Sequence, residues 1–146
     1  MKLTSTDFAF KSIDIGSIQV SVDGDLFACD NIHTTRYTNS LIQITASEPN
    51  VGLTIVLSSR STGLYNIGGE EANSITYTNV TYIDSGSVET KFTSQQKSNS
   101  IGTIEVLETD LENNTISGVF NGTIVLDNDA NTSLEITNGL FNQIPF

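Results

Sequence analysis

The stretch GTIEVLETDLENNTISGVFNGTIVL, residues 102–126, decides the fold of this chain. Apolar and polar residues alternate through 103–106 and again through 116–126. A period of two indicates β-strands, because successive side chains of a strand point to opposite faces. Between the two segments, 110–114 reads DLENN, and short polar side chains of this kind satisfy the backbone of a turn. The stretch therefore predicts an antiparallel hairpin.

Two rules conflict within the second segment, at Asn121-Gly122. This dipeptide is a strong signal for a two-residue hairpin. If the chain runs straight through instead, the positions of one parity in 116–126 are Ile, Gly, Phe, Gly, Ile and Leu, with no polar residue among them. A turn would pair apolar with polar residues on both faces, which a half-buried sheet disfavours. We predict one continuous strand that buries Phe120, in which the glycines mark a bulge or a close approach of backbones.

The rest of the chain repeats short alternating segments separated by turn residues. The clearest hairpin joins 18–22 to 26–28 through Asp23-Gly24, a dipeptide that tolerates positive φ at both positions. Segment 53–57 has apolar residues on both parities, so it is expected to be a central strand.

Two other segments depart from simple alternation. Residues 75–83 change phase between Tyr77 and Val80, which predicts a bulge at the two residues between them. Residues 30–40 are polar and are expected to form an exposed loop or a ragged sheet edge.

The composition favours strands and turns throughout. The 146 residues are rich in Thr, Ser, Asn and Ile, and no window carries apolar residues at the helical period. This length suits one domain with a core of its own. We predict an all-β fold: a single domain over 1–146, built as an antiparallel β-sandwich or partly closed barrel of about ten strands, without significant helix.

The charge of the chain limits its partners. Seventeen acidic and six basic residues give a formal charge of −11, and most of the acidic residues follow residue 60. A nucleic-acid backbone would be repelled, so we predict no nucleic-acid partner. No window approaches the roughly 20 apolar residues that a membrane-spanning helix needs, so we predict no transmembrane segment. The acidic residues are expected to form a solvated face that protects the sheet edges.

The side chains on which most enzyme chemistry depends are scarce. A nucleophilic triad or dyad requires a histidine, and the only one is His33, in a polar segment. The single Cys29 follows apolar residues, which predicts a buried thiol, and one His with one Cys does not make a histidine-based zinc site. Carboxylate pairs such as Glu105 with Glu108 are expected by chance in so acidic a chain. We therefore expect no enzyme, no catalytic residue and no cofactor.

One segment resembles the start of a calcium-binding loop. Asp127, Asp129 and Asn131 place oxygen ligands at alternate positions. Further on, Thr132 stands where an EF-hand requires Gly and Asn138 stands where it requires Glu, so an EF-hand is excluded. A turn rich in Asn and Asp explains the same residues. We expect no metal site, and a generic calcium site at these three residues is the alternative.

Aromatic side chains are the candidates for stacking on a ligand. They are Tyr37, Tyr65, Tyr77, Tyr82 and Phe92, and the chain contains no Trp. Trp and Tyr combine an apolar body with a polar tip and suit a sugar-binding surface, so the absence of Trp weakens a carbohydrate-binding interpretation. Packing across the sheet explains each of these residues as well.

A family resemblance rests on the order of several short motifs. They are VDGDLFA at 22–28, IQITA at 42–46, TIVL at 54–57, GLYNI at 63–67, GTIEV at 102–106, DLENNTISGVF at 110–120 and EITNGLF at 135–141. In this order and spacing the chain resembles an uncharacterised family of Bacteroidetes lipoproteins that is described as a domain of unknown function. The resemblance implies a β-rich periplasmic or surface domain and brings no known activity, substrate or catalytic residue.

The resemblance also sets an expectation for location. Such proteins begin with a signal peptide and a lipid-acceptor Cys, and the printed sequence starts Met1-Lys2-Leu3 with neither. If a signal peptide was removed, the domain is expected to be extracytoplasmic. We predict a non-enzymatic module of the cell envelope or surface, binding or structural, with a protein or glycan partner. The alternatives are a virion structural or decoration protein and, third, a calcium-dependent adhesion or carbohydrate-binding module.

Overall fold

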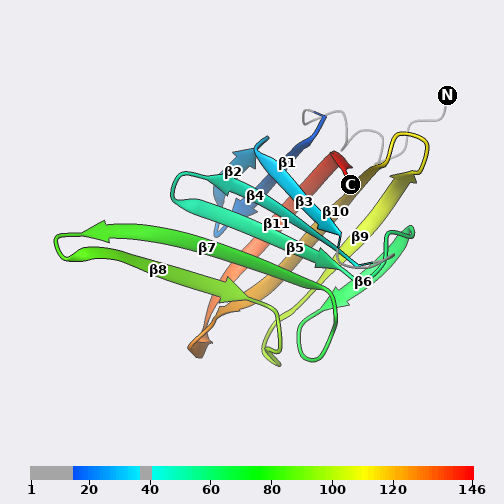
Figure 1. Cartoon of the computed structure of the whole chain (residues 1–146). Coiled ribbons are helices and arrows are strands. Elements are labelled where there is room, and N and C mark those ends of the chain that lie inside the picture. The colour runs from blue at the N-terminus through cyan, green and yellow to red at the C-terminus, as the bar shows by residue number, and fades with distance from the viewer. Residues whose placement is uncertain (1–14, 37–40) are drawn as a thin grey trace.

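The computed structural model describes residues 15–36 and 41–146, and these residues form one curled antiparallel sheet, a half-barrel (Figure 1). The part of the chain so described contains no helix. It contains eleven strands: β1 (Ser17–Val22), β2 (Asp25–Cys29), β3 (Ile32–Arg36), β4 (Ile42–Glu48), β5 (Val51–Leu57), β6 (Gly63–Ile67), β7 (Ser74–Ile83), β8 (Gly86–Thr93), β9 (Ile101–Asp110), β10 (Thr115–Leu126) and β11 (Asp129–Pro145). The predicted all-β sandwich or partly closed barrel is confirmed.

The strands follow the order β2-β1-β11-β10-β8-β7-β5-β4-β3, and β10 is a branch point in this order. One edge of β10 pairs with β11 along its length. The other edge is shared, because residues 115–123 pair with β9 while Val125 and Leu126 pair with β8. Strand β6 extends the sheet beyond β9.

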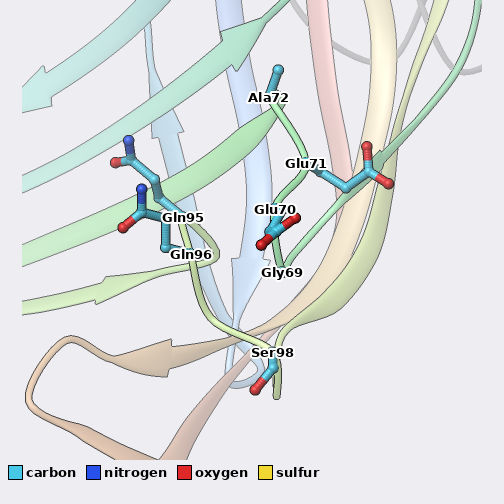
Figure 2. A pocket seen from close by; sticks show the side chains of 7 residues that line it. All are labelled: Gly69, Glu70, Glu71, Ala72, Gln95, Gln96 and Ser98. Carbon is cyan, nitrogen blue, oxygen red and sulfur yellow. The ribbon is translucent and has the colours of Figure 1, made fainter.

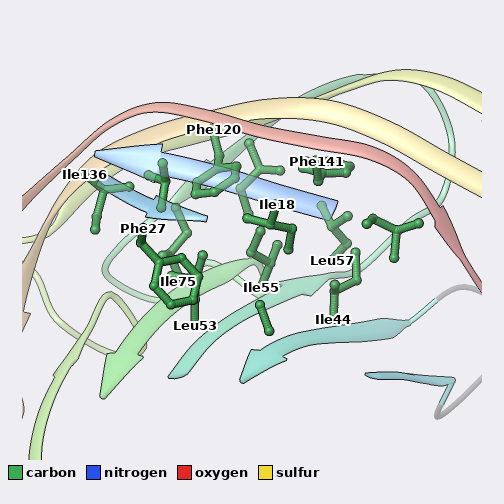
Figure 3. Packing of buried hydrophobic residues seen from close by; sticks show 14 of the residues in the cluster. Ile18, Phe27, Ile44, Leu53, Ile55, Leu57, Ile75, Phe120, Ile136 and Phe141 are labelled. Carbon is green, nitrogen blue, oxygen red and sulfur yellow. The ribbon is translucent and has the colours of Figure 1, made fainter. Parts of the chain in front are cut away.

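The core lies between the two halves of the curled sheet. Figure 3 shows Ile18, Phe120 and Phe141, from β1, β10 and β11, facing Leu53 and Ile55 of β5. All five side chains are buried, and they belong to one continuous apolar cluster. Inward positions of β4, β5 and β7 supply its other half, as in a sandwich whose two layers belong to one sheet.

Strand β10 is continuous through Asn121-Gly122, as predicted, and Phe120 is buried against the ring of Phe141, with ring centroids 6.2 Å apart. The glycines are sites of close approach. A Cβ on Gly118 would collide with the backbone of β9 and with the Phe141 ring. Pairing with the neighbouring strands is also irregular on both sides of this part of β10. The expected bulge and close backbone approach are therefore both present.

Two predicted hairpins are confirmed, and their turns show why the chain reverses there. Strands β9 and β10 are joined by a turn in which one carboxylate oxygen of Asp110 accepts hydrogen bonds from the backbone N–H groups of Glu112 and Asn113, each at 3.0 Å. Strands β1 and β2 are joined at Asp23 and Gly24, whose φ angles of 48° and 86° fit a type I′ turn.

One local prediction needs correction, and another, the ragged sheet edge at 30–40, is confirmed in part. Strand β7 pairs with β5 and with β8 in unbroken register through Thr78 and Asn79, so the bulge predicted there is wrong. The change of phase has another cause: this part of β7 leaves the core, so its inward side chains Asn79 and Thr81 are exposed and need not be apolar. Part of the polar segment 30–40 forms β3, the strand at one end of the sheet order, while 37–40 lie outside the described residues.

Candidate functional site

Strands β7 and β8 form a projecting hairpin, which we call the arm and which Figure 1 shows reaching past the other strands. Strand β7 pairs with β5 only as far as Asn79. Beyond that point, residues 80–83 of β7 pair with residues 86–89 of β8, and on the other side the Val80 N–H donates to the Asn50 carbonyl oxygen at 2.8 Å. Near the tip the arm exposes three large side chains: Tyr82 (69%), Ile83 (50%) and Val88 (49%).

A cleft of about 400 Å³ lies between the arm and the β1–β2 hairpin, and we call it the arm cleft. Six of its apolar or aromatic side chains are buried or half-buried: Val22, Phe27, Val51, Tyr77, Phe92 and Leu134. The remaining side chains are mostly exposed and mainly polar: Asp23, Asp25, Leu26, Asn79, Thr81 and Thr90. An apolar pocket of a few hundred Å³ with a few convergent polar groups is typical of small-ligand sites in proteins.

Strand alternation explains how the polar groups reach this cleft. On β7, Ile75, Tyr77, Asn79 and Thr81 share the inward parity. Ile75 is fully buried in the core, and the residues after it become polar as the strand leaves the core. On β8, Thr90 pairs with Asn79, so both hydrogen-bonding side chains lie on the same face of the arm.

The aromatic part of the cleft is a cross-strand pair. Tyr77 lies directly opposite Phe92 on β8 and opposite Leu53 on β5, and both rings pack against the core. Burial raises the pKa of the Tyr77 phenol above its ordinary value, and the negative charge of Asp25 raises it further. The phenol is therefore a neutral hydrogen-bonding group at physiological pH, and the nearby Asp25 carboxylate opposes its ionisation.

Most polar side chains of the arm cleft are not engaged by the protein. Within 15–36 and 41–146, the side chains of Asp25, Tyr77, Asn79 and Thr90 make no hydrogen bond or ion pair. Asp23 differs, because its Oδ1 accepts a hydrogen bond from the backbone N–H of Glu135 at 2.7 Å. Uncommitted donors and acceptors beside an aromatic surface are available to a ligand, and so is the second carboxylate oxygen of Asp23.

The five aromatic candidates from the sequence are divided by the structure. Tyr77 and Phe92 meet in the arm cleft. Tyr82 has the opposite parity on β7 and points away from it. The Tyr65 hydroxyl donates to the carbonyl oxygen of Ser61 at 2.6 Å, and Tyr37 lies outside the described residues.

Sequence reasoning missed the polar residues that complete the cleft. The sequence assigns Asp23 only to a turn and Asn79 only to a bulge, and it does not single out Asp25. The available signal was parity. Asp25 shares the inward parity of the buried residues Phe27 and Cys29, where a carboxylate is out of place in a core strand.

The calcium candidates are part of a closed turn. Asp129 accepts hydrogen bonds from the backbone N–H of Asn131 at 3.0 Å and from the hydroxyl of Thr132 at 2.8 Å. The Thr132 hydroxyl and the Asn131 N–H lower the pKa of the Asp129 carboxyl. Asp127 faces Lys97, whose Nζ lies 3.5 Å from its carboxylate. Across the described ranges, no group of three or more His, Cys, Asp or Glu residues is placed to hold a metal ion.

The other reactive side chains lie in β2 and β3. His33 is exposed on β3 and does not line the arm cleft. Cys29 is buried, as predicted, and its thiol donates to the carbonyl oxygen of Ser47 at 3.4 Å. Burial raises the pKa of Cys29, which keeps the thiol protonated.

A second concave region lies between two loops at the base of the arm. Figure 2 shows Gln95 and Gln96 on one loop and Glu70 and Glu71 on the other. The region has a volume of about 710 Å³, and no lining side chain is a larger hydrophobic group than that of Ala72. It offers hydrogen-bonding groups without an apolar anchor, so the arm cleft is the better candidate site.

Over residues 15–36 and 41–146, the fold and the cleft define a class: a β half-barrel with an open cleft that is lined by acidic and aromatic side chains and lies beside a projecting hairpin. Among the residues with a described structure, no helix is long and apolar enough to cross a membrane. The chain belongs to the family named "Domain of unknown function (DUF6252)", whose model matches residues 15–145. Searches of curated proteins and of solved structures found no match to the chain.

Proposed function

We propose that this chain is a non-enzymatic binding module of the cell envelope or cell surface, and that the arm cleft is its binding site. The observation that carries the proposal is the set of uncommitted polar side chains, including Asp25 and Asn79, above the Tyr77 and Phe92 rings. Buried polar side chains are normally hydrogen-bonded within the protein, whereas Asp25 and Asn79 are exposed and can hydrogen-bond with a ligand. These groups are held in place by a rigid sheet and left open to solvent, which suits recognition.

The non-enzymatic part of the proposal is supported by the chemistry of the cleft. Its titratable side chains are Asp23, Asp25 and Tyr77, without a histidine, lysine or cysteine. One oxygen of Asp23 is already bound to the backbone of β11. The set lacks histidine, the side chain most often used in general acid–base catalysis, and it lacks the cysteine or lysine of many covalent mechanisms.

The location in the envelope is supported by the resemblance to lipoproteins and is tested by the gene. The coding sequence immediately upstream of Met1 should encode a signal peptide that ends in a lipid-acceptor Cys. Fractionation of cells that express the full-length protein should place it in the membrane fraction, and removal of that Cys should release it. A genuine start codon at Met1 would contradict the proposed location and would favour a virion or cytoplasmic role.

Binding through the cleft is tested by two substitutions at neighbouring positions of β7. Asn79→Tyr fills the cleft, whereas Val80→Tyr adds the same side chain to the opposite face without a change of charge. Labelled wild-type protein is expected to bind envelope preparations in a saturable manner. Asn79→Tyr should abolish that binding and Val80→Tyr should retain it. Equal binding by the two variants would show that the arm cleft is not the binding site.

A further inference from the structure

The arm cleft carries an uncompensated negative charge. Asp23 and Asp25 line it, and no Lys, Arg or His does. The nearest candidate along the chain is Lys91, between Thr90 and Phe92, and strand alternation places its side chain on the other face of β8. The cleft therefore presents two carboxylates beside apolar surface, in a chain whose formal charge is −11.

The two carboxylates are positioned by the fold. The β1–β2 turn fixes Asp23, because its backbone N–H donates to the Glu135 carbonyl at 2.8 Å while its Oδ1 accepts from the Glu135 N–H. Its second oxygen has no such partner. Asp25 begins β2 opposite Val22, with the parity of buried Phe27. Asp23 is therefore a fixed acceptor, which loses little conformational entropy when it binds a ligand, while Asp25 has only its backbone fixed by the sheet.

The aromatic groups of the cleft match the same ligand chemistry. Phe27, Tyr77 and Phe92 present three rings within one cleft. The face of an aromatic ring attracts an ammonium or guanidinium group, and it also packs against the methylene groups that carry such a cation. A neutral ligand would use the rings and the amide of Asn79 but would leave the carboxylate charges unpaired.

Resting on the proposed function of the cleft, we infer that the ligand is a basic side chain of a polypeptide. Its guanidinium or ammonium group lies between Asp23 and Asp25, and its methylene groups pack on the aromatic rings. The polypeptide source is favoured by the shape of the surface around the cleft. The inward face of the arm continues past Thr81 and Thr90 to Ile83 and Val88, which are about half exposed. A chain that supplies the cation can continue along this apolar strip, whereas a small free amine makes no use of it.

The test is a titration of ¹⁵N-labelled protein, followed by backbone amide shifts, with the peptide acetyl-Gly-Val-Arg-Val-Gly-amide. The control peptide carries citrulline, a neutral isostere, in place of Arg. Binding of the Arg peptide should shift the amides around Asp25 and Thr90 and should weaken as salt rises from 50 to 300 mM. The citrulline peptide should bind at least about tenfold more weakly, since a hydrogen bond to a charged group contributes about 1.5–3 kcal/mol.

Matched variants separate a role of Asp25 from general electrostatics. Asp25→Asn should reduce affinity for the Arg peptide about tenfold, while Asp84→Asn, which removes the same charge from the exposed tip of the arm, should leave it nearly unchanged. Equal losses in the two variants would overturn the inference and would indicate long-range attraction only. Amide spectra of both variants verify that the fold is intact.

Three further outcomes would each overturn the inference in a distinguishable way. If the citrulline peptide or N-acetylglucosamine binds the cleft as well as the Arg peptide does, the ligand class is wrong while the cleft remains a binding site. If n-butylguanidinium binds as tightly as the peptide, the cation is right and the polypeptide source is wrong. If no probe shifts the cleft amides while envelope binding is still lost in Asn79→Tyr, the proposed function stands without this ligand.

Discussion

The sheet contains two long hairpins, β10–β11 and β7–β8, that are alike in alternation but differ in what they bury. Strand β10 has β9 beside it and β11 has β1 beside it, so the first hairpin is flanked on both sides and buries Phe120 and Phe141. The arm loses its neighbour β5 after Asn79, and Tyr82 near its tip is 69% exposed. An alternating sequence therefore specifies a strand, and the neighbouring strands decide whether that strand forms core or a projecting surface.

The largest expected contrast compares the same kind of truncation in the two hairpins. Phe120→Ala should lower the free energy of unfolding by roughly 3–5 kcal/mol, because it removes buried area and leaves a cavity beside Phe141. Tyr82→Ala should change it by less than about 0.5 kcal/mol. Urea denaturation followed by circular dichroism measures both. A cost below about 1 kcal/mol for Phe120→Ala would mean that Phe120 does not pack in the core.

A smaller effect tests the close packing of β10 from the opposite direction, by the addition of one methyl group. Gly118→Ala should destabilise the protein by about 1–3 kcal/mol, because the new Cβ meets the Glu105 carbonyl and the ring of Phe141. Ser133→Thr, which adds a methyl group at an exposed position of β11, is the matched control and should be nearly neutral. Equal stabilities of the two variants in the same denaturation experiment would show that β10 has room at Gly118.

In the arm, the substitution Asp25→Asn is expected to cause a modest change in the pKa of Tyr77. The pKa of Tyr77 should fall in Asp25→Asn, because one of the two causes that raise it is removed, and should stay above its ordinary value because burial remains. A raised folded-state pKa stabilises the fold below the ordinary tyrosine pKa of about 10 and loses that contribution as pH rises further. NMR of ¹³C-labelled tyrosine rings measures this pKa. An unchanged value would mean that Asp25 does not face the phenol.

The smallest expected effect concerns the turn that closes the packed hairpin. Calcium should cause no saturable, calcium-selective rise in melting temperature, because the Asp129 carboxylate is occupied by Asn131 and Thr132. A true site would add about 2.7 kcal/mol at a hundredfold excess over the dissociation constant. Magnesium at matched ionic strength controls for screening of the negative charge. A saturable shift that is lost in Asp127→Asn with Asp129→Asn would make calcium-dependent adhesion the leading function.

The sequence specifies local structure more fully than the cleft. The continuity of β10 and the turn at Asp23-Gly24 follow from parity and turn chemistry, which involve residues close in the chain. The cleft joins Asp25 to Tyr77 and Phe92 from distant strands. Their proximity depends on how far the sheet curls and on where β5 stops pairing with β7, and no local pattern encodes either. For the same reason the phase change in β7 suggested a bulge where the structure has an arm.

The pairing of β1 with β11, in which Ser17 lies opposite Asn142, has a consequence for the order in which the protein is made and folded. The β1–β2 hairpin comes first in chain order among the described strands, and the other neighbour of β1 in the sheet, β11, comes last among them. Before β11 is synthesised, the apolar side chains of Ile18 and Val20 lack the strand that completes their layer. Contacts so distant in sequence form slowly, and an uncovered strand edge invites association with other chains. Until β11 has been synthesised, the edge of β1 that pairs with it is therefore open to association with other chains.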